Sequence, residues 1–417
     1  MNSSIISVGT ELLMGQITDT NQAELSRTLN AYGIDVLYRY TVGDNPGRLE
    51  ETVRDALSKT DLVISTGGLG PTEDDLTKEV FAKVMGRELV QDERALGEMN
   101  EQAMEIGVTV TENTYRQSLV PEGAEIFYNG AGVAPGFAVT EGGKTIVCLP
   151  GPPRELKSVL ENGAGSFLKS FGSGALYYRV VGLFGKGEPA VETDLKDLID
   201  GQTDPTIATY AKEGECTVRV ASKRDTEQEA KDAVDAVVEE IVRREKGYVF
   251  TDTGETLPQT VGKMLLKDKI TISCCESCTG GLFAGTLTSI PGISEVFDRG
   301  LVTYTYHAKM DELGVSEETL ARETAVSSAV CDEMVSGLSK KTGSDLCLSV
   351  TGLAGPGGGT KEKPVGLVYI GGIYRDRKEI VELRIADLGR EWIRKYAVLA
   401  MFDLARELIL GEPVSPM

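Results

Sequence analysis

Short runs of β-branched and aliphatic residues alternate with helical patterns over roughly the first 170 residues of the chain. The predicted strands cover residues 5–8, 35–42, 62–65 and 145–149, and the predicted helices cover residues 21–32, 47–59, 76–85 and 154–168. This alternation is typical of a parallel sheet covered by helices, because a helix supplies the crossover between parallel strands. We therefore expect an α/β layer domain over residues 1–172, ending at a glycine-rich break over residues 171–174.

Two further domains are expected after this break. A small α+β module over residues 173–252 contains predicted strands at 177–183, 206–210 and 216–221, a helix at 188–199 and a long helix at 226–245. From residue 253 to 417 helices and strands alternate again, and an amphipathic helix from about residue 388 to 410 ends this third, α/β domain. Three domains agree with the length of 417 residues, since one domain takes roughly 100 to 200 residues.

The charge balance limits the partners. With 43 basic and 64 acidic residues the net charge is −21, which repels nucleic acid and anionic membrane surfaces, so we expect neither as a partner. No apolar run approaches the roughly 18 residues that a membrane span needs, and the first residues lack an export signal. We expect a cytoplasmic protein.

The counts of histidine and cysteine limit the chemistry. One histidine, His307, excludes sites built from several histidines, and seven scattered cysteines are typical of a reduced compartment. A serine nucleophile in this chain must therefore rely on His307 or, as we expect, on a base of another kind.

A glycine-rich loop follows the predicted strand at residues 62–65. Its sequence is TGGLGPT, residues 66–72, and its candidate phosphate-binding residues are Gly67, Gly68, Gly70, Pro71 and Thr72. Glycines at a strand-to-helix turn allow backbone N–H groups to approach an anion, and the following helix adds its positive end. Asp74 and Asp75 could hold a divalent cation that bridges phosphate oxygens, or could only cap the helix, and the sequence leaves both interpretations open.

Three other clusters fall near strand ends of the same domain. They lie at residues 9–13 with 19–21, at 134–136 and at 149–155. Ligands of open α/β sheets bind beyond the carboxyl ends of the strands, so we expect these loops to share one pocket with the glycine-rich loop.

A serine stands at a strand-to-helix turn in the third domain. The predicted strand at residues 270–275 leads into ESCTGG, residues 276–281, and then into a helix. Ser277 is the candidate nucleophile, and the N–H groups of Thr279, Gly280 and Gly281 are candidates to stabilise an oxyanion. Three alternatives stay open: Ser277 as a helix cap, Cys278 as the nucleophile, and Cys275 with Cys278 as a CxxC redox pair.

Lysine is the natural base for this serine. Residues 302–309 offer Tyr304 and Lys309. A buried lysine can lose its proton near neutral pH and act as the base of a Ser-Lys pair, whereas the residues alone equally allow Lys309 to be a solvated surface residue. A second glycine-rich loop, TGLAGPGGG at residues 351–359, contributes the candidate substrate-binding residues Thr351, Gly352, Gly355 and Gly357.

The clusters of the first domain resemble the molybdopterin-binding-like domain of the CinA (competence/damage-inducible) family. The shared motifs are GTELL at 9–13, DTN at 19–21, TGGLGPTxDD at 66–75, APGF at 134–137 and LPGPP at 149–153. The resemblance implies metal-dependent cleavage of the pyrophosphate of ADP-ribose, with Mg, Mn or Co as the divalent metal. It implies that Glu11, Asp74 and Asp75 hold the metal, and that Gly151 joins the glycine-rich loop in binding the nucleotide. Val133 departs from the family, which usually shows Thr there.

The third domain resembles the C-terminal CinA domain, also called PncC, of the nicotinamide-nucleotide amidases. The shared motifs are ESCTGG, a VTYSNxAK-like run at 302–309, AVS at 325–327, a TGIAGPGGG-like run at 351–359 and KPVG at 363–366. The resemblance implies hydrolysis of nicotinamide mononucleotide to nicotinate mononucleotide and ammonia, with Ser277 as nucleophile, Lys309 as base and Tyr304 as a hydroxyl that orients or relays the proton. Thr305 and Tyr306 replace the Ser-Asn of the family, so one side-chain amide is missing.

The resemblance covers the whole chain, implies a KH-like fold for the middle module and suggests a homodimer. Taken together, the sequence predicts an enzyme of pyridine-nucleotide salvage, with an amidase in the third domain that needs no cofactor and an ADP-ribose pyrophosphatase in the first. The alternative is a non-catalytic protein that binds a pterin or nucleotide and has a regulatory or competence-related role.

Overall fold

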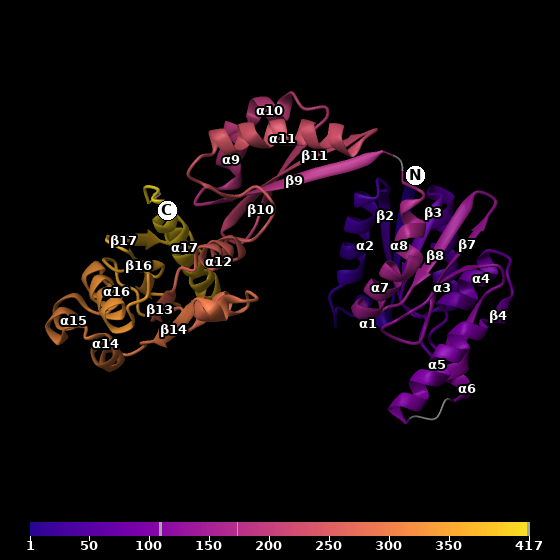
Figure 1. Ribbon diagram of the computed structural model, residues 1–417, viewed down its shortest axis with the longest axis horizontal. Helices are drawn as coiled ribbons and strands as arrows, with labels where there is room; N and C mark the ends of the chain where they lie inside the picture. The colour runs from indigo at the N-terminus through magenta and orange to yellow at the C-terminus, as the bar shows by residue number, and fades with distance from the viewer. Residues whose placement is uncertain (108–110, 173, 415–417) are drawn as a thin grey trace. The chain divides into compact units, whose positions relative to one another are not determined.

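The computed structural model describes residues 1–107, 111–172 and 174–414 (Figure 1). The chain forms two compact units, one made of Met1–Tyr177 with Lys223–Ala230, the other of Tyr178–Ser222 with the chain from Lys231 onward. The predicted boundary between the first two domains falls at Ser173, which lies outside the described residues. None of the helices in the described ranges is long and apolar enough to span a membrane.

A mostly parallel sheet lies at the centre of the first unit. Its strands are β1 (Asn2–Val8), β2 (Asp35–Val42), β3 (Leu62–Thr66), β6 (Glu125–Phe127), β7 (Gly136–Glu141) and β8 (Lys144–Leu149), and a separate ribbon consists of β4 (Leu89–Gln91) and β5 (Leu119–Pro121). The order across the sheet is β2-β1-β3-β8-β7-β6. β1, β2, β3 and β8 pair in parallel, and β7 and β6 add an antiparallel edge.

Helices cover both faces of this sheet. They are α1 (Thr10–Leu13), α2 (Thr20–Ala31), α3 (Pro46–Lys59), α4 (Thr77–Val84), α5 (Glu93–Ile106), α6 (Glu112–Tyr115), η1 (Arg116–Ser118), α7 (Pro153–Val159), η2 (Leu160–Ala164) and α8 (Gly165–Lys169). Because successive strand residues point to opposite faces, Ile5 packs with α2, α7 and α8, whereas Ile6 packs with α3 and α4 (Figure 1). The result is the three-layer α/β domain expected from the sequence.

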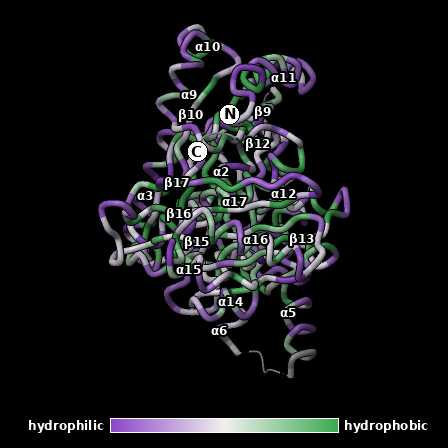
Figure 2. The backbone as a smooth tube through the Cα atoms, turned by 90° about the vertical axis from the view of Figure 1, so that its left-hand side faces the viewer, coloured by the Kyte–Doolittle hydropathy of each residue, from purple (hydrophilic) through white to green (hydrophobic). Residues whose placement is uncertain are grey.

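The middle module is a small antiparallel sheet with helices. Its strands are β9 (Ala175–Phe184), β10 (Thr206–Ala211), β11 (Glu215–Arg224) and β12 (Val249–Thr251), and its helices are α9 (Glu188–Asp194), α10 (Lys196–Asp200) and α11 (Glu227–Arg244). The strand order is β10-β11-β9-β12. Figure 2 shows long hydrophilic stretches along α10 and α11, while Val234, Val238 and Ile241 of α11 are buried. A stripe of this kind is the core face of an amphipathic helix.

The last part of the chain is built around a second α/β sheet. Its strands are β13 (Ile272–Glu276), β14 (Phe297–Val302), β15 (Leu346–Gly352), β16 (Leu367–Tyr374) and β17 (Arg377–Arg384), in the order β14-β13-β15-β16-β17. β13 pairs in parallel with β14 and β15, and β16 and β17 run antiparallel. The carboxyl end of β13, which leads to Ser277, therefore lies between the carboxyl ends of β14 and β15.

Two layers of helices enclose this sheet. They are α12 (Leu257–Asp268), α13 (Leu282–Thr288), η3 (Ile293–Glu295), α14 (Tyr306–Leu313), α15 (Glu317–Glu323), α16 (Ser328–Thr342) and α17 (Arg390–Leu410). Cys274 of β13 packs on the side of α12, α13 and α17, and Cys275 packs on the side of α14, α15 and α16. The α/β class predicted for this domain is confirmed.

Two predicted helices are interrupted in the structure. The helix predicted over residues 154–168 breaks within η2, where Gly163 has φ 132° and a Cβ there would lie 3.3 Å from the Phe127 ring. The helix predicted over residues 188–199 divides at Leu195 into α9 and α10. In the first case close packing against Phe127 favours the glycine break over a continuous helix.

Candidate functional sites

Ser277 and Lys309 contact each other at the carboxyl edge of the second α/β sheet. Ser277 lies in the loop between β13 and α13, and Lys309 lies in the first turn of α14. Lys309 Nζ is 2.9 Å from Ser277 Oγ. Both residues are buried, with relative exposures of 0% for Lys309 and 8% for Ser277. The structure therefore brings together the nucleophile and the base that the sequence predicts.

The surroundings of Lys309 favour its neutral form. Burial lowers the pKa of Lys309 to about 8. Its Nζ lies 2.7 Å from the carbonyl oxygen of Thr303 and 3.5 Å from that of Tyr304. A neutral amine has two hydrogens and one lone pair, so the two carbonyls can accept the hydrogens while the lone pair faces the hydroxyl of Ser277. This arrangement can accept a proton from the serine.

Thr305 and Tyr306 have structural roles at this position. Thr305 caps α14, because its hydroxyl accepts the N–H of Ala308 at 3.1 Å. The hydroxyl of Tyr306 accepts the N–H of Ala325, also at 3.1 Å. Thr305 therefore caps the helix that carries Lys309, as the Ser of the family motif can, and Tyr306 ties α14 to the segment before α16.

The Ser277 loop is held from both sides. The N–H of Ser277 donates to the carbonyl of Val350 in β15. Gly280 and Gly281 follow with φ values of 61° and 94°, a conformation that favours glycine. The N–H of Gly280 donates to the carbonyl of Ser277, and the N–H of Gly281 donates to the carboxylate of Glu276. Two of the three predicted oxyanion donors, Gly280 and Gly281, are thus engaged within the loop, and Thr279 keeps a free N–H among the described residues.

The thiol of Cys278 stays protonated, which is the wrong state for a nucleophile. Its side chain is buried, and burial raises the pKa of the Cys278 thiol to about 12. At neutral pH the thiol stays protonated, whereas the thiolate is the reactive form. Cys275 is also buried, and both are free thiols. This environment favours Ser277 over Cys278.

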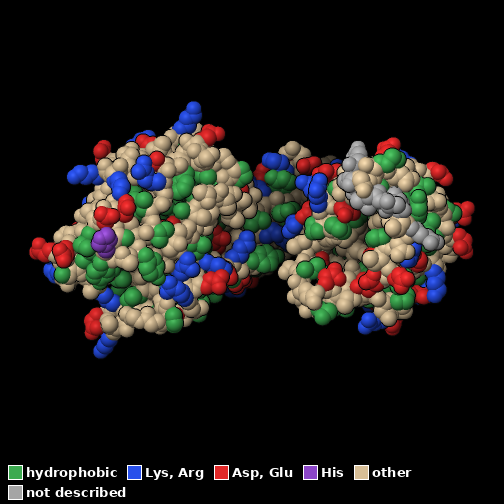
Figure 3. Space-filling view, turned by 90° about the horizontal axis from the view of Figure 1, so that it is seen from below, with side chains coloured by type: hydrophobic (Ala, Val, Ile, Leu, Met, Phe, Trp, Pro, Cys, Tyr) green, Lys and Arg blue, Asp and Glu red, His purple; other side chains and the backbone are tan. Residues whose placement is uncertain are grey.

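Tyr304 lies beside Lys309 through its backbone, and its hydroxyl is bonded to an arginine. Its side chain is 56% exposed, and its hydroxyl accepts a hydrogen bond from Arg390 Nη2 at 3.1 Å. The contact of Tyr304 with Lys309 is made by its backbone carbonyl, and a role of the hydroxyl in orienting or relaying the proton stays a prediction. Figure 3 shows hydrophobic side chains gathered beside the chain's one histidine, and Tyr304, Tyr306 and Val302 are among the exposed apolar residues of this segment.

Two arginines at the start of α17 complete the site, and the sequence analysis missed both. Arg390 donates from Nη1 to the carbonyl of Gly355 at 2.8 Å, and Arg394 donates from Nη2 to the carbonyl of Thr279 at 2.6 Å. Residues four apart share one face of a helix, so the predicted helix from about residue 388 already placed them together. Only the fold reveals that this face meets the Ser277 loop and the second glycine-rich loop.

The second glycine-rich loop presents backbone groups near Arg390. Thr351 is anchored, because its hydroxyl donates to the carbonyl of Ala325 at 2.7 Å, and Gly352 ends β15. The N–H groups of Gly355 and Gly357 have no acceptor among the described residues, and nothing lies within 4 Å of a Cβ built at Gly357. The loop and Arg390 together can hold an anionic group.

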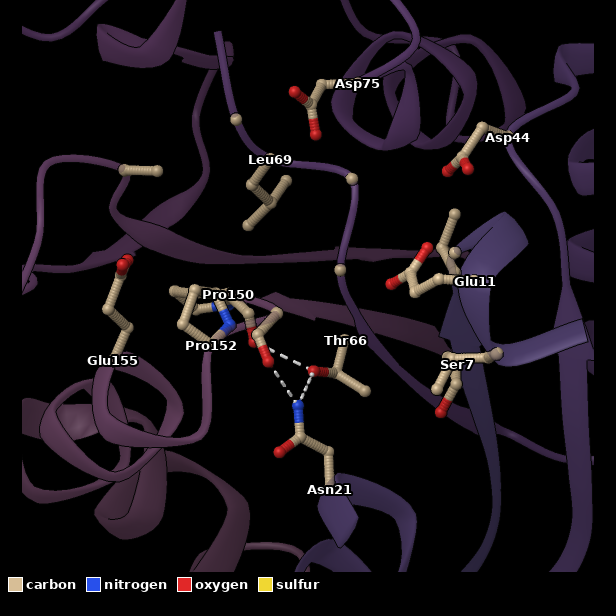
Figure 4. A pocket seen from close by; sticks show the side chains of 18 of the residues that line it. Ser7, Glu11, Asn21, Asp44, Thr66, Leu69, Asp75, Pro150, Pro152 and Glu155 are labelled. Atoms are coloured by element: carbon tan, nitrogen blue, oxygen red, sulfur yellow. Dashed lines mark hydrogen bonds between the residues drawn. The ribbon is translucent and has the colours of Figure 1, made fainter. Parts of the chain in front are cut away.

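The first unit contains a separate cavity of about 600 Å³. All the predicted residues of this unit line it, namely Glu11, Gly67, Gly68, Gly70, Pro71, Thr72, Asp74, Asp75 and Gly151. The strand-end loops at residues 19–21 and 150–153 line it as well. The sequence prediction that these loops share one pocket agrees with this geometry (Figure 4).

The backbone of the glycine-rich loop is packed closely under this cavity. Gly67 has φ 102°, and a Cβ there would lie 2.2 Å from the carbonyl oxygen of Val8. The hydroxyl of Thr77 donates to the carbonyl of Gly67 at 2.8 Å, which fixes the loop to the start of α4. Asn21 supports the other side, donating from Nδ2 to Thr66 Oγ1 and to the carbonyl of Gly151 (Figure 4).

The carboxylates around the cavity have the chemistry that a hard divalent cation prefers. Figure 4 shows Glu11, Asp44 and Asp75 on one side of the pocket. Asp44, which the sequence analysis missed, accepts the N–H of Thr10, and Asp75 accepts the N–H and the hydroxyl of Thr72. Asp19 Oδ2 is buried and lacks a partner in the described part of the chain.

No three histidine, cysteine or acidic residues gather as a metal-binding group among the described residues. Mg²⁺ is often bound through one or two carboxylates with substrate phosphates and waters. The predicted metal ligands Glu11, Asp74 and Asp75 line the same cavity but do not form one such group. A cation here would need ligands from a bound phosphate or from water as well.

Family comparisons match all three parts of the chain. Residues 254–409 match the CinA C-terminal domain, residues 178–251 match the damage-inducible protein CinA KH domain, and residues 4–169 match a domain described as a probable molybdopterin binding domain. The three matches follow the order that the sequence analysis expected.

Two full-length relatives support the same assignment. A CinA-like protein from Dictyoglomus thermophilum is 44% identical over 411 residues, covering 99% of this chain and 100% of the relative. A CinA-like protein from Dictyoglomus turgidum is 43% identical with the same coverage. The crystal structure of competence/damage inducible protein CihA from Agrobacterium tumefaciens is 39% identical, covering 38% of this chain and 99% of that one, with a TM-score of 0.36. The chain belongs to the CinA family.

Proposed function

We propose that the last domain is an amidase that hydrolyses the carboxamide of nicotinamide mononucleotide to nicotinate mononucleotide and ammonia. The contact between Lys309 Nζ and Ser277 Oγ carries this proposal. A buried lysine with a pKa of about 8 is partly neutral at physiological pH, so it can take the serine proton.

The proposed reaction is an acyl transfer in two steps. Ser277 Oγ attacks the amide carbon while its proton passes to Lys309. Lys309 returns that proton to the departing nitrogen, the C–N bond breaks, and ammonia leaves an acyl-enzyme ester. Water then attacks the ester, Lys309 accepts a proton from the water and returns it to Ser277, and the carboxylate product is released.

The surroundings of the serine favour a nucleotide substrate. Arg390 is tied both to the hydroxyl of Tyr304 and to the carbonyl of Gly355, so its guanidinium is positioned beside the free N–H groups of the glycine-rich loop. Arginine and backbone N–H groups together make a common binding site for phosphate. In a chain of net charge −21, this local positive group supports recognition of an anionic substrate.

Ammonia release from nicotinamide mononucleotide tests the proposal. The purified chain is compared with Ser277→Ala, Lys309→Met and Cys278→Ala, each with and without a chelator. We expect activity in the wild type and in Cys278→Ala, unaffected by chelation, and loss by a factor of about 1,000 or more in the other two variants. A folded wild type that releases no ammonia would contradict the proposal.

The cavity of the first unit favours a second activity, metal-dependent cleavage of the pyrophosphate of ADP-ribose. The supporting observation is that a glycine-rich loop and carboxylates line one cavity. Glu11, Asp74 and Asp75, which all line the cavity, would contribute carboxylate ligands to a divalent Mg, Mn or Co ion bound together with the substrate phosphates. The bound ion would supply charge neutralisation at the phosphates, while the N–H groups of residues 67–72 orient them.

Binding and turnover of ADP-ribose separate this proposal from a pocket that only binds. We expect calorimetry to detect ADP-ribose binding that weakens in Asp75→Asn, and we expect AMP release only when a divalent metal is added. Binding without release of AMP under any of the three metals would favour the alternative of a nucleotide-binding domain without catalysis.

A further inference from the structure

Glu276 lies directly before the nucleophile and is almost fully buried, with a relative exposure of 1%. Its side chain turns toward the start of α13. Oε2 accepts the N–H of Gly281 at 3.0 Å and of Phe283 at 3.1 Å, and Oε1 accepts the N–H of Ala284 at 2.9 Å. A carboxylate at the end of a strand therefore closes the loop that contains Ser277.

This bonding determines which backbone N–H groups of the loop are free. The N–H of Ser277 donates to Val350, that of Gly280 to Ser277 and that of Leu282 to Thr279, all through carbonyl oxygens. The Glu276 carboxylate accepts the N–H groups of Gly281, Phe283 and Ala284. Over residues 277–284, the N–H groups of Cys278 and Thr279 are the ones without an acceptor in any other described residue. The N–H of Cys278 has only its own thiol as a neighbouring acceptor in the described part of the chain.

The peptide groups on both sides of these two N–H groups are held by neighbouring elements. The Glu276 carbonyl accepts the N–H of Thr303, which joins the loop to the segment that carries Lys309. The carbonyl of Thr279 accepts a hydrogen bond from Arg394 at 2.6 Å. Thr279 itself is fully buried, and its hydroxyl has no partner among the described residues. The flanking peptide groups, 276–277 and 279–280, therefore cannot rotate without breaking bonds to two neighbouring elements. The carbonyl of Ser277, which shares a peptide group with the N–H of Cys278, accepts the N–H of Gly280.

We infer that the N–H groups of Cys278 and Thr279 stabilise the oxyanion formed when Ser277 attacks, and that Glu276 is the positioning residue that holds them in place. This inference rests on the proposed acyl transfer by Ser277. In this inference the oxyanion donors are Cys278 and Thr279, and Gly280 and Gly281 are no longer among them. A carboxylate suits this role because it only accepts hydrogen bonds, whereas the NH₂ group of an amide would face N–H donors.

The first experiment separates positioning from mere stabilisation of a helix start. Glu276→Gln is compared with Glu333→Gln, since Glu333 also caps a helix, accepting the N–H of Ser316 and the hydroxyl of Thr319, away from Ser277. We expect Glu276→Gln to lower kcat by about 10-fold or more with KM changed by less than about twofold. We expect Glu333→Gln to leave both constants unchanged. Equal effects of the two variants, or a change confined to KM, would overturn the inference.

The second experiment removes single N–H groups. Backbone esters are introduced at Cys278, at Thr279 and, as the matched control, at Leu282, by replacing each residue with its α-hydroxy acid. The readout is the burst of nitrophenolate from p-nitrophenyl acetate, with Ser277→Ala as the blank. Losing an oxyanion donor costs about 100-fold or more where it has been measured, so we expect slower acylation in the first two esters and not in the third.

The activated ester, p-nitrophenyl acetate, distinguishes failure of the proposed substrate from failure of the proposed oxyanion donors. A wild type that shows the burst but releases no ammonia from nicotinamide mononucleotide would contradict the proposed substrate, and the esters would still test the oxyanion donors. Unchanged acylation in both the Cys278 and Thr279 esters would overturn the inference. Absence of any burst that depends on Ser277 would overturn it as well.

Discussion

Lys309 Nζ lies 2.9 Å from Ser277 Oγ, although the two residues are 32 positions apart in the chain. The proximity depends on parallel pairing of β13 with β14, which places the turn after one strand beside the helix after the other. Burial then lowers the pKa of Lys309 to about 8. The same two facts, proximity and burial, lead to the first two predictions.

The amidase activity is predicted to rise with pH. Lys309 accepts the serine proton only when neutral, so the active fraction of enzyme increases as pH passes through the pKa of about 8 and is constant above it. The measurement is kcat/KM for nicotinamide mononucleotide across this range, because kcat/KM reports the ionisation of the free enzyme. A profile that is flat across this range, or that falls with increasing pH, would exclude Lys309 as the base.

Lys309→Met is predicted to stabilise the protein near neutral pH while abolishing activity. The pKa of Lys309 is lowered from 10.5 to about 8, so the unfolded chain binds the proton more tightly and the protonated lysine destabilises the fold. One pKa unit corresponds to about 1.4 kcal/mol, so the gain in free energy of unfolding is at most about 3 kcal/mol, less the lost hydrogen bonds.

Urea unfolding of the wild type and of Lys309→Met at several pH values measures this difference in free energy of unfolding. The lysine penalty is fully present below the folded pKa of about 8 and disappears as pH approaches the unfolded value of 10.5. The gain in free energy of unfolding of Lys309→Met over the wild type should therefore shrink as the pH rises from about 8 to 10.5. An advantage that is independent of pH would point to packing and not to the charge.

The alternation of strands and helices predicted the four parallel strands of the first sheet, because such strands leave strong local patterns of buried aliphatic residues. In the second sheet it predicted the α/β class and the strand at residues 270–275, which is β13, but not the individual strands β14 to β17. The antiparallel β6 and β7 and the β4-β5 ribbon were missed, since these short strands have little periodicity of their own. The break at Gly163 was also missed, because it depends on contact with Phe127, which is distant in sequence. Tertiary packing decided each of these cases.

Some residues of the candidate sites can be recognised from the local sequence, and others cannot. Ser277 and Lys309 stand in motifs that can be recognised locally. Arg390 meets Tyr304 across 86 positions, and Arg394 meets Thr279 across 115, so no local pattern reveals their partners. The oxyanion donors were assigned partly wrongly for the same reason, because the hydrogen bonds of Glu276 depend on how α13 returns over the end of β13.

Arg390 is predicted to select phosphorylated substrates. Its guanidinium is fixed by the hydroxyl of Tyr304 and the carbonyl of Gly355, beside the glycine-rich loop. We expect Arg390→Ala to raise KM for nicotinamide mononucleotide by about 10-fold or more and to change turnover of nicotinamide riboside far less.

Steady-state kinetics with both substrates checks the role of Arg390. Arg384→Ala is the matched control, since Arg384 pairs with Glu382 on β17 and should affect neither substrate. Equal loss for the mononucleotide and the riboside would assign Arg390 to the reaction centre and not to the phosphate.

Gly67→Ala is predicted to destabilise the first unit and to abolish ADP-ribose binding while leaving the amidase intact. A Cβ at Gly67 would lie 2.2 Å from the carbonyl oxygen of Val8, and backbone atoms in a parallel sheet cannot move aside cheaply. Gly86→Ala is the matched control, because Gly86 also has a positive φ, of 66°, but nothing lies within 4 Å of its Cβ. Strain at positive φ alone costs about 1 kcal/mol, so Gly86→Ala should retain binding and Gly67→Ala should not.

Calorimetric titration with ADP-ribose measures binding by the first unit, and ammonia release measures the activity of the second unit. Parallel loss of both activities in Gly67→Ala would mean that the two units do not fold independently, and unchanged ADP-ribose binding would mean that the loop between β3 and α4 is not the nucleotide site.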